Sequence, residues 1–371
     1  MKVLIIGEYS GFAKNLSDGF SKLGHVAVVF SSGDGWKNIP LGTNDRHLPQ
    51  LKNFSLFGIT LKKSWMLRGI WDSYYFHKGL CKCRDFFDVA IIIHYEFIRL
   101  EREFWRPTFS LKDIKFLLSN KEQIYLSACG DDFPYLTYFP KFRYHPPINL
   151  KSNPFLHGRL VSVFNKVLYS AKGVIPVMYD YAVAYRDMFS DSDINVYPTI
   201  PLPINLDKYS EENRIGRKIV IFHGINRPEK GTDIILRALN RIGETYPEKV
   251  EIIVEGKMEF EKYVCVLRKS NIVVDQCWGY GYGINAIISM AMGKIVLSGN
   301  EPENREGFDQ AAPVVNILPN EEHIFDTLSK LINNVEQLKI ISSNSRAFVE
   351  KNHADVLVAK KYMSLFCKYI K

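Results

Sequence analysis

The sequence predicts an α/β protein with two Rossmann-like domains that face each other across an interdomain cleft. Along both halves of the chain, short runs of Val, Leu and Ile alternate with amphipathic stretches, as expected for parallel sheets covered by helices on both faces. The length of 371 residues suits two domains better than one core. Between the halves, prolines occupy positions 198, 201 and 203. Because proline continues neither a helix nor a strand ladder, these residues predict an extended linker.

The first half begins with a typical buried parallel strand, residues 2–7, which ends at a glycine. Residues 12–23 carry apolar side chains at helical spacing and are followed by Gly24, a common helix stop. The same two patterns predict further strands and helices. The strands are expected at residues 25–30, 87–93, 123–129 and 173–177, and the helices at residues 108–119, 155–171 and 178–189.

The alternation restarts after the linker. Strands are expected at residues 218–223, 250–255, 272–275 and 294–298, and helices at residues 231–242, 258–269, 284–292, 320–333, 335–350 and 354–371. We therefore expect an N-terminal domain over residues 1–200, a linker over 201–209 and a C-terminal domain over 210–353. The last helix is a candidate to pack back on the N-terminal domain. Ligands of open α/β sheets bind at the carboxyl ends of the strands, so the cleft is the expected site.

Composition and charge limit the classes of protein to which this chain can belong. No window of about 18 residues is apolar enough for a transmembrane helix, and the N-terminus lacks the apolar core of a signal peptide. We therefore expect a cytoplasmic protein. The six cysteines lack the spacing of a four-ligand zinc site and are expected to be reduced thiols. The net charge of +8 arises mainly in the first 200 residues, which favours an anionic partner there. No nucleic-acid-binding module is recognisable, so nucleic acid is not expected as a partner.

Two familiar site types are disfavoured. The loop after the first strand, residues 7–11, lacks the Gly-x-Gly-x-x-Gly dinucleotide fingerprint, and no Walker A sequence occurs. A nicotinamide enzyme is therefore disfavoured, and no cofactor is expected. Residues 191–193 form an Asp-x-Asp pattern of the kind that can hold a metal ion, but they precede an ordinary strand. We expect no metal.

Two loops of the second half carry candidate binding groups. Arg227 and Lys230 lie between an expected strand and an expected helix, where free N–H groups and the helix dipole attract phosphate. The alternative is that both are solvated loop cations. In the next such loop, glycines at positions 279, 281 and 283 let the backbone approach a ligand and offer N–H donors. The alternative there is a tight turn packed by Tyr280 and Tyr282.

These two loops resemble the donor-binding domain of family 4 retaining glycosyltransferases of the GT-B fold, of the bacterial polysaccharide type. The matching stretches are His-Gly-x-Asn-Arg-Pro-Glu-Lys-Gly-Thr-Asp at residues 223–233, Val-Asp-Gln at 274–276, Gly-Tyr-Gly at 281–283 and Ser-Met-Ala-Met-Gly-Lys-Ile-Val at 289–296. The opening strand and the linker also fit. The resemblance spans nearly the whole chain and is strongest over residues 218–300.

The resemblance implies roles for particular residues. Arg227 and Lys230 would hold the donor diphosphate and stabilise the charge that builds on the leaving nucleotide. The second loop would contact the sugar and phosphates through its backbone, and the end of the strand at 250–255 would begin the loop beside the nucleoside base. The loop after the first strand would close over the donor. The donor-binding residues implied in this way are Gly7, Gly11, Arg227, Lys230, Glu255, Gly256, Tyr280, Gly281, Tyr282, Gly283, Ile284 and Asn285.

The sequence departs from this family at its Glu-x7-Glu signature. Alignment of the Gly-Tyr-Gly motif places Tyr280 and Ile288 at the two glutamate positions. The first glutamate normally contacts sugar hydroxyls and the second a ribose hydroxyl; Tyr280 keeps a phenol, but Ile288 cannot form a hydrogen bond. Glu301 and Glu303 could reach the same edge of the cleft, with solvated loop acids as the alternative.

Candidate acceptor-side residues follow two strands of the first half. Asp131 and Asp132 come after the strand at 123–129, and His94 follows the strand at 87–93. At the carboxyl ends of strands, such groups could orient an acceptor hydroxyl or assist its deprotonation. The alternative for the aspartates is a helix-capping or turn role, with a similar structural role for the histidine.

Residues 46–82 combine many cations with a single acid, Asp72, and with aromatic side chains. This mixture suits peripheral contact with an anionic membrane or a lipid-linked sugar acceptor. The alternative is an ordinary insertion whose aromatic residues form core. The cations are Arg46, Lys52, Lys62, Lys63, Arg68, Lys78 and Lys82, and the aromatic residues are Phe54, Phe57, Trp65, Trp71, Tyr74, Tyr75 and Phe76.

The expected function is therefore glycosyl transfer with retention of configuration. The donor would be a nucleotide-sugar, used as a substrate, and the acceptor a glycan or lipid-linked sugar in cell-surface polysaccharide synthesis. The loss of both signature glutamates favours an alternative, a non-catalytic binding or scaffold protein of the same fold. A sugar-nucleotide epimerase of the GT-B fold is the third possibility.

Overall fold

The structure is a computed structural model of the 371-residue chain. It describes residues 1–34, 37, 39–40, 42, 45–47, 55–56, 59–60, 62–100, 108–210, 213–225, 227–256 and 258–369. Part of the basic and aromatic segment at 46–82, including Lys52, Phe54 and Phe57, lies outside these residues.

The N-terminal half forms a six-stranded parallel sheet in the order β10-β9-β6-β1-β2-β3. The five strands expected from the sequence are present, and a short edge strand, β3, was not expected. The bounds are β1 Lys2–Ile6, β2 Val26–Ser31, β3 Arg46–His47, β6 Val89–Ile92, β9 Ile124–Ala128 and β10 Gly173–Pro176. Two small two-stranded ladders, β4 Ser55–Leu56 with β5 Ile59–Thr60 and β7 Ile98–Arg99 with β8 Phe109–Ser110, lie outside the main sheet.

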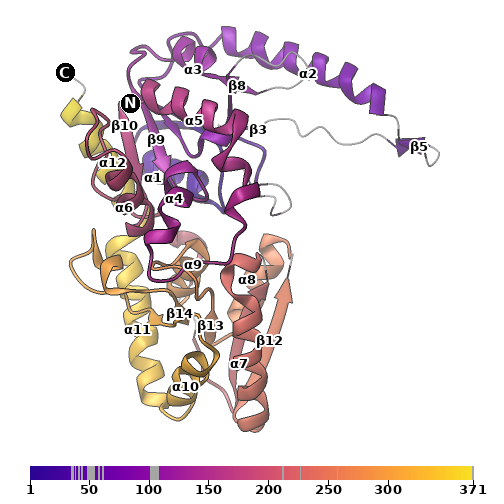
Figure 1. Ribbon diagram of the computed structural model, residues 1–371, viewed down its shortest axis with the longest axis vertical. Helices are drawn as coiled ribbons and strands as arrows, with labels where there is room; N and C mark the ends of the chain where they lie inside the picture. The colour runs from indigo at the N-terminus through magenta and orange to yellow at the C-terminus, as the bar shows by residue number, and fades with distance from the viewer. Residues whose placement is uncertain are drawn as a thin grey trace.

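Helices α1 Phe12–Lys22, α3 Leu111–Leu117, α5 Gly158–Ser170 and α6 Tyr179–Met188 match expected helices. Helices α2 Lys62–Cys81 and α4 Phe133–Tyr138 were not expected. In Figure 1, α2 lies at the top of the N-terminal half, at the end remote from the C-terminal half.

The C-terminal half forms a five-stranded parallel sheet in the order β12-β11-β13-β14-β15. Its strands are β11 Ile219–Ile225, β12 Val250–Gly256, β13 Ile272–Val274, β14 Ile295–Ser298 and β15 Val315–Asn316. The helices that follow them are α7 Thr232–Thr245, α8 Phe260–Lys269, α9 Ile284–Ala291, α10 Glu321–Ile332 and α11 Val335–Asn352. Two parallel sheets with helices between their strands confirm the α/β prediction of two Rossmann-like domains.

The last helix, α12 Asp355–Tyr369, crosses back to the N-terminal half and packs on α1 (Figure 1). Phe366 and Tyr362 lie against Phe20 of α1. Close approach depends on Gly19, because a Cβ at that position would overlap the backbone carbonyl of Asp355.

The linker and the start of α12 run side by side. The Ile204 N–H donates to the His353 carbonyl at 2.7 Å, and the Asp355 N–H donates to the Ile204 carbonyl at 2.9 Å. The chain therefore passes between the domains twice at one place, and the two passages are hydrogen-bonded to each other.

We expect Gly19→Ala to lower the free energy of unfolding by about 1–3 kcal/mol, because an added methyl group forces α1 and α12 apart. Urea unfolding of the two proteins measures this change. Gly79→Ala is the matched control, since Gly79 also lies in a helix but a Cβ there meets nothing within 4 Å. That variant should be unchanged or stabilised by up to about 1 kcal/mol. Equal effects of the two substitutions would contradict the packing argument.

Candidate functional site

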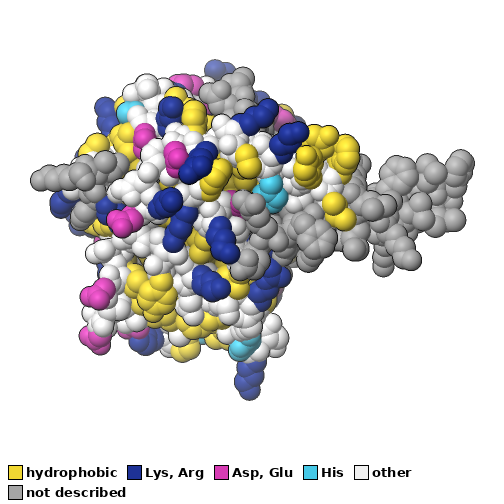
Figure 2. All heavy atoms as spheres, turned by 90° about the horizontal axis from the view of Figure 1, so that it is seen from above, with side chains coloured by type: hydrophobic (Ala, Val, Ile, Leu, Met, Phe, Trp, Pro, Cys, Tyr) yellow, Lys and Arg dark blue, Asp and Glu magenta, His cyan; other side chains and the backbone are white. Residues whose placement is uncertain are grey.

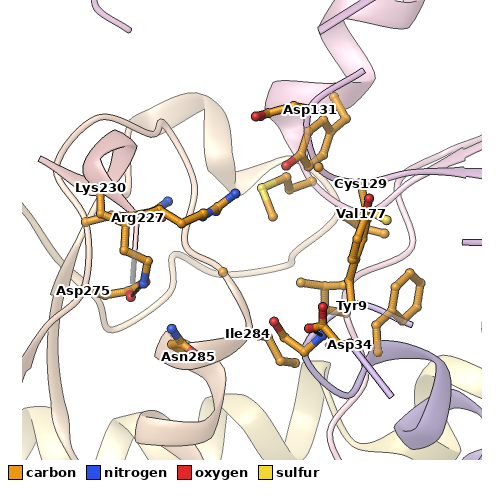
Figure 3. Close-up of a pocket in the computed structure, with 18 of the residues that line it drawn as sticks. Tyr9, Asp34, Cys129, Asp131, Val177, Arg227, Lys230, Asp275, Ile284 and Asn285 are labelled. Atoms are coloured by element: carbon orange, nitrogen blue, oxygen red, sulfur yellow. Dashed lines mark hydrogen bonds and ion pairs between the residues drawn. The ribbon is translucent and has the colours of Figure 1, made fainter. Parts of the chain in front are cut away.

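A cavity of about 540 Å³ lies between the two domains, at the carboxyl ends of strands from both sheets. Figure 3 shows side chains from both halves turned toward it. The cavity is lined by Tyr9, Ser10, Phe12, Asp34, Lys37, Cys129, Gly130, Asp131, Phe155, Val177, Met178, Tyr181, Leu202, Arg227, Lys230, Asp275, Gln276, Gly283, Ile284 and Asn285. Its position is the one expected from the topology.

The cations of the C-terminal domain lie on one side of this cavity. Arg227 and Lys230 sit in the turn between β11 and α7, and Gly231 begins α7 with a φ of 81°. A Cβ at Gly231 would overlap the Cys277 sulfur, so the turn needs glycine there. Arg227 is exposed, as expected for a loop cation. Lys230 is not: it is only 6% exposed, because its ammonium forms an ion pair with the Asp275 carboxylate. The alternative of a solvated loop cation therefore does not describe Lys230.

The glycine-rich loop contributes to the cavity only through its end. Gly283, Ile284 and Asn285 line the cavity at the start of α9. Gly281 does not line it, and neither does the tyrosine on each side of that glycine.

Tyr280 and Tyr282 instead pack the loop against other parts of the chain. The Tyr280 hydroxyl accepts a hydrogen bond from the backbone N–H of Arg143 at 2.6 Å. The backbone N–H of Tyr280 donates to the Asp180 carboxylate at 3.1 Å. Burial raises the pKa of that Asp180 carboxyl to about 6. The Tyr282 hydroxyl bonds to the His353 ring at 3.1 Å. Both tyrosines therefore serve the packed turn that was the alternative interpretation.

Ile288, at the second signature position, lines a smaller hollow of about 40 Å³ that adjoins the main cavity. The two hollows share Ser10, Lys37 and Asn285. The remaining lining residues of the smaller one are Ile39, Gly224, Met258, Phe260 and Tyr263. This hollow is therefore mostly apolar.

Glu255 and Gly256 end β12 but line neither hollow. The Glu255 carboxylate pairs with Lys262 at 2.9 Å on the surface of α8. A contact of these two residues with a nucleoside base remains an expectation.

The loop after β1 reaches the cavity through Tyr9 and Ser10 rather than through its glycines. A Cβ at Gly7 would overlap the Phe97 ring, and Gly11 begins α1 with a φ of 94°. The buried Glu8 carboxylate accepts hydrogen bonds from the N–H groups of Gly11, Ala13 and Lys14. The first turn of α1 is therefore already capped by a carboxylate of the same chain, and burial raises the pKa of that carboxyl to about 7.

His94 lies beneath the cavity rather than in it. Its Nε2–H donates to the Asp131 carbonyl at 3.0 Å, and its Nδ1 accepts from the Glu96 N–H at 3.3 Å. Burial lowers its pKa to about 3, so the ring is neutral near pH 7 and both nitrogens are occupied. These contacts shape the loop that carries Asp131, as in the structural alternative considered from the sequence.

Asp132 is a buried helix cap. Its carboxylate accepts from the Tyr135 N–H at 2.9 Å and from the Tyr185 hydroxyl at 2.8 Å. Burial, the largest effect, raises its pKa to about 7. Asp132 does not line the cavity, so the capping alternative describes it.

Asp131 is the one acceptor-side candidate of the three that lines the cavity. Burial raises its pKa, and the nearby Arg227 guanidinium acts in the opposite direction. Figure 3 shows Asp131 and Arg227 on facing walls. The preceding Gly130 has a φ of 87° and packs on the Tyr9 ring, which turns the loop so that Asp131 faces the cavity.

Several lining residues were not singled out from the sequence. Asp275 and Gln276 follow β13 directly, and their signal was the Val-Asp-Gln stretch at the end of that strand. Asp34 and Lys37 pair with each other at 2.6 Å after β2. No sequence pattern marked them, because their relation to the cavity depends on how the domains meet.

Glu301 and Glu303 join the two domains beside the glycine-rich loop. Glu301 accepts from the Arg143 guanidinium at 2.7 Å and from the Tyr144 hydroxyl at 2.8 Å, and Glu303 also pairs with Arg143. Burial acts to raise the pKa of the Glu301 carboxyl, but hydrogen bonds from Asn316, Tyr144 and Arg143 outweigh it and lower this pKa. The Arg143 bond lowers the pKa of the Glu303 carboxyl. Neither carboxylate lines the cavity, and neither is a free loop acid.

Within the described residues, no group of three or more His, Cys, Asp or Glu side chains is placed to hold a metal ion. Among those same parts of the chain, no helix has the length and apolar character needed to cross a membrane. All six cysteines are free.

No family model and no curated protein sequence match the chain. Solved structures do. Sucrose-phosphate synthase from Thermosynechococcus elongatus is 12% identical over 99% of both chains, with a TM-score of 0.62. Anabaena HepE, solved in complex with UDP-glucose, is 12% identical over 99% of this chain and 100% of that one, with a TM-score of 0.56. A putative UDP-N-acetylglucosamine 2-epimerase from Listeria monocytogenes is 11% identical over 98% and 94% of the two chains, with a TM-score of 0.52. At these identities the similarity shows the fold, and it confirms the GT-B prediction.

The pH dependence of stability provides a test of the Asp132 environment. Its carboxyl has a pKa of about 7 when folded, against the ordinary value of 3.8, so the folded chain keeps a proton that the unfolded chain loses. The contribution of Asp132 is therefore largest below pH 4 and is lost as the pH rises through 7. We expect Asp132→Asn, which cannot titrate, to gain stability relative to the wild type by up to about 1.4 kcal/mol per pH unit between pH 4.5 and 7.

Urea unfolding of both proteins across this range measures the difference. Asp191→Asn, at an exposed position, controls for the loss of one carboxylate. If the difference in unfolding free energy between the wild type and Asp132→Asn does not change with pH, the raised pKa of the Asp132 carboxyl is contradicted.

Proposed function

We propose that the protein is a glycosyltransferase that moves a sugar from a nucleotide-sugar donor to a glycan or lipid-linked acceptor. The observation that carries this proposal is the placement of Arg227 and Lys230 at the N-terminus of α7, in a cavity whose opposite wall carries Asp131. Two cations beside free helix N–H groups suit a diphosphate. The acid across the cavity suits a hydroxyl that attacks the donor. The fold shared with HepE, which was solved with UDP and with UDP-glucose, makes UDP-sugars the first donors to test.

Arg227 and Lys230 would stabilise the negative charge that develops on the departing nucleotide, the main electrostatic requirement of the reaction. Because two fixed cations meet this requirement, the proposed reaction is independent of metal. Lys230 would exchange its Asp275 partner for a phosphate oxygen when the donor enters. Closure of the two domains would exclude water, so that the sugar passes to the acceptor rather than to solvent.

Asp131 is the proposed acceptor-side residue. Its raised pKa suits a group that receives a proton or a hydrogen bond from the attacking hydroxyl. We propose retention of configuration and a role in cell-surface polysaccharide synthesis on the strength of the loop motifs alone.

Two alternatives share the same cavity. Tyr280 and Ile288 supply no carboxylate to a donor, which favours a non-catalytic sugar-nucleotide-binding or scaffold protein. The structural similarity to a putative epimerase supports the third possibility. Binding of UDP without transfer to any acceptor would favour the first of these, and conversion of a UDP-sugar to its epimer would favour the second.

We further propose peripheral contact with an anionic membrane through the outer face of the N-terminal domain. Trp71, Tyr74, Tyr75 and Lys78 lie at helical spacing on one side of α2, and the three aromatic side chains are 63%, 57% and 50% exposed. Figure 2, which looks onto this end of the molecule, shows Lys and Arg side chains interspersed with hydrophobic ones. Exposed aromatic rings beside cations are typical of surfaces that bind at the lipid headgroup level.

Arg227→Ala should weaken UDP binding about 10–100-fold and reduce sugar transfer at least as strongly, because one charge-assisted contact to the diphosphate is lost. Thermal shift and calorimetry with UDP and a panel of UDP-sugars measure binding, and release of UDP with a glycan acceptor measures transfer. Without ligand the variant should unfold within about 0.5 kcal/mol of the wild type, since Arg227 is exposed. Arg217→Ala, at a cation that is 89% exposed outside the cavity, is the control. Wild-type turnover in Arg227→Ala would exclude the proposed role.

The membrane proposal is tested by sedimentation with vesicles of neutral phosphatidylcholine or of phosphatidylcholine with phosphatidylglycerol. We expect binding to the anionic vesicles only, and at least a fivefold loss of binding in Trp71→Ser/Tyr75→Ser. Tyr169→Ser removes another exposed ring, 75% exposed on α5, and controls for a general loss of aromatic surface. Equal binding of all three proteins would count against α2 as the contact.

A further inference from the structure

Asp275 is a buried carboxylate at the edge of the main cavity. It follows β13 directly, and its N–H donates to the Leu297 carbonyl at 2.8 Å, which extends the sheet by one residue. The side chain lines the cavity but is only 4% exposed. Figure 3 shows it meeting Lys230 on the side of the cavity opposite Tyr9 and Asp34.

Only one of the two oxygens of this carboxylate has a partner among the described residues. Oδ1 holds the Lys230 ammonium, whereas Oδ2 is buried and has no hydrogen-bond partner among the described residues. A buried charged oxygen without a partner is costly, and such groups are rare in folded proteins. The χ2 angle of aspartate is soft, so the carboxylate can turn either oxygen toward the cavity when Lys230 is drawn away from it.

The chemistry of the group selects its ligand. A carboxylate only accepts hydrogen bonds, so the partner must carry a donor. A metal ion is disfavoured, because an ammonium already lies against this carboxylate and no group of three metal-ligating side chains occurs among the described residues. A phosphate is excluded by its charge. Among the neutral donors of a sugar-nucleotide, the hydroxyls of the sugar and of the ribose lie next to the diphosphate, which Lys230 would hold.

Tyr280 occupies the position at which the resembled glycosyltransferase family has a glutamate for such a contact, and its side chain is already engaged elsewhere. Tyr280 is turned away from the cavity, with its hydroxyl on the Arg143 N–H and its ring against the Arg143 guanidinium at 4.6 Å. It is also packed against Phe142 and Tyr144 of the N-terminal domain. A contact to a ligand through this side chain would require the domain junction to open.

We propose that Asp275 recognises a hydroxyl of the donor sugar-nucleotide, next to its diphosphate, and so replaces the carboxylate that is missing at position 280. The inference rests on the proposed donor site. In the empty site Asp275 keeps Lys230 in place. In the occupied site Lys230 turns to the diphosphate, and the freed carboxylate accepts the hydroxyl. The hydroxyl belongs either to the transferred sugar or to the ribose, and both offer the same chemistry.

Calorimetry with UDP, 2′-deoxy-UDP and the UDP-sugar preferred by the wild type tests the proposal in Asp275→Asn. In this variant the amide oxygen stays available to Lys230, and an NH₂ group replaces the accepting oxygen. If the transferred sugar is recognised, the preference for the UDP-sugar over UDP should fall at least 10-fold. If the ribose is recognised, the preference for UDP over 2′-deoxy-UDP should fall by the same factor.

Two comparison variants make the result specific. Lys230→Gln should weaken all three ligands, because each of them carries the diphosphate, and the glutamine amide can still donate a hydrogen bond to Asp275. Asp233→Asn, on the exposed first turn of α7 and outside the cavity, should change none of the affinities. Unchanged preference ratios in Asp275→Asn, with UDP still bound, would overturn this inference alone. Failure of the wild type to bind any nucleoside diphosphate or nucleotide-sugar would overturn the proposed donor site as well.

Discussion

The arrangement of the cavity depends on the place where the chain crosses twice between the domains. The linker residue Ile204 is hydrogen-bonded on one side to His353 and on the other to Asp355. The Lys22 ammonium of α1 pairs with Asp355 at 2.8 Å and so attaches the N-terminal domain to the same junction. His353 also contacts the linker carbonyl of Leu202 and the Tyr282 hydroxyl. The glycine-rich loop is thus attached to this junction, and movement of the domains would be transmitted to the start of α9.

Electrostatics divides the cavity between the domains. The C-terminal domain contributes two cations and one acid, Arg227, Lys230 and Asp275, and the N-terminal domain contributes two acids and one cation, Asp34, Asp131 and Lys37. A ligand with an anionic end and a hydroxyl-bearing end would contact the cations of one domain and the acids of the other, whereas each domain alone offers only half of these contacts. Arg143, Glu301 and Glu303 add a second bridge between the domains outside the cavity, beside Tyr280.

Sequence patterns anticipated the elements well and the side-chain roles unevenly. Continuous runs of Val, Leu and Ile predicted the strands because a parallel strand is buried on both faces. Of the donor-binding residues implied by the loop motifs, Arg227, Gly283, Ile284 and Asn285 line the cavity. The motif did not predict the burial of Lys230, because Asp275, the partner of this lysine, is 45 residues away in the sequence. Nor could it separate Asp131 from Asp132, which are neighbours in sequence but point to opposite environments.

The sequence by itself determined the α/β alternation, the proline linker and the two cation-bearing and glycine-bearing loops, because these follow from local periodicity and backbone preference. Only the tertiary structure decided which groups face the cavity. Whether Tyr280 contacts a ligand or the other domain depends on Arg143 and Asp180, and whether Asp275 is paired or available depends on Lys230. Such relations join residues distant in the chain, and burial and charge act on them only after the two domains have met.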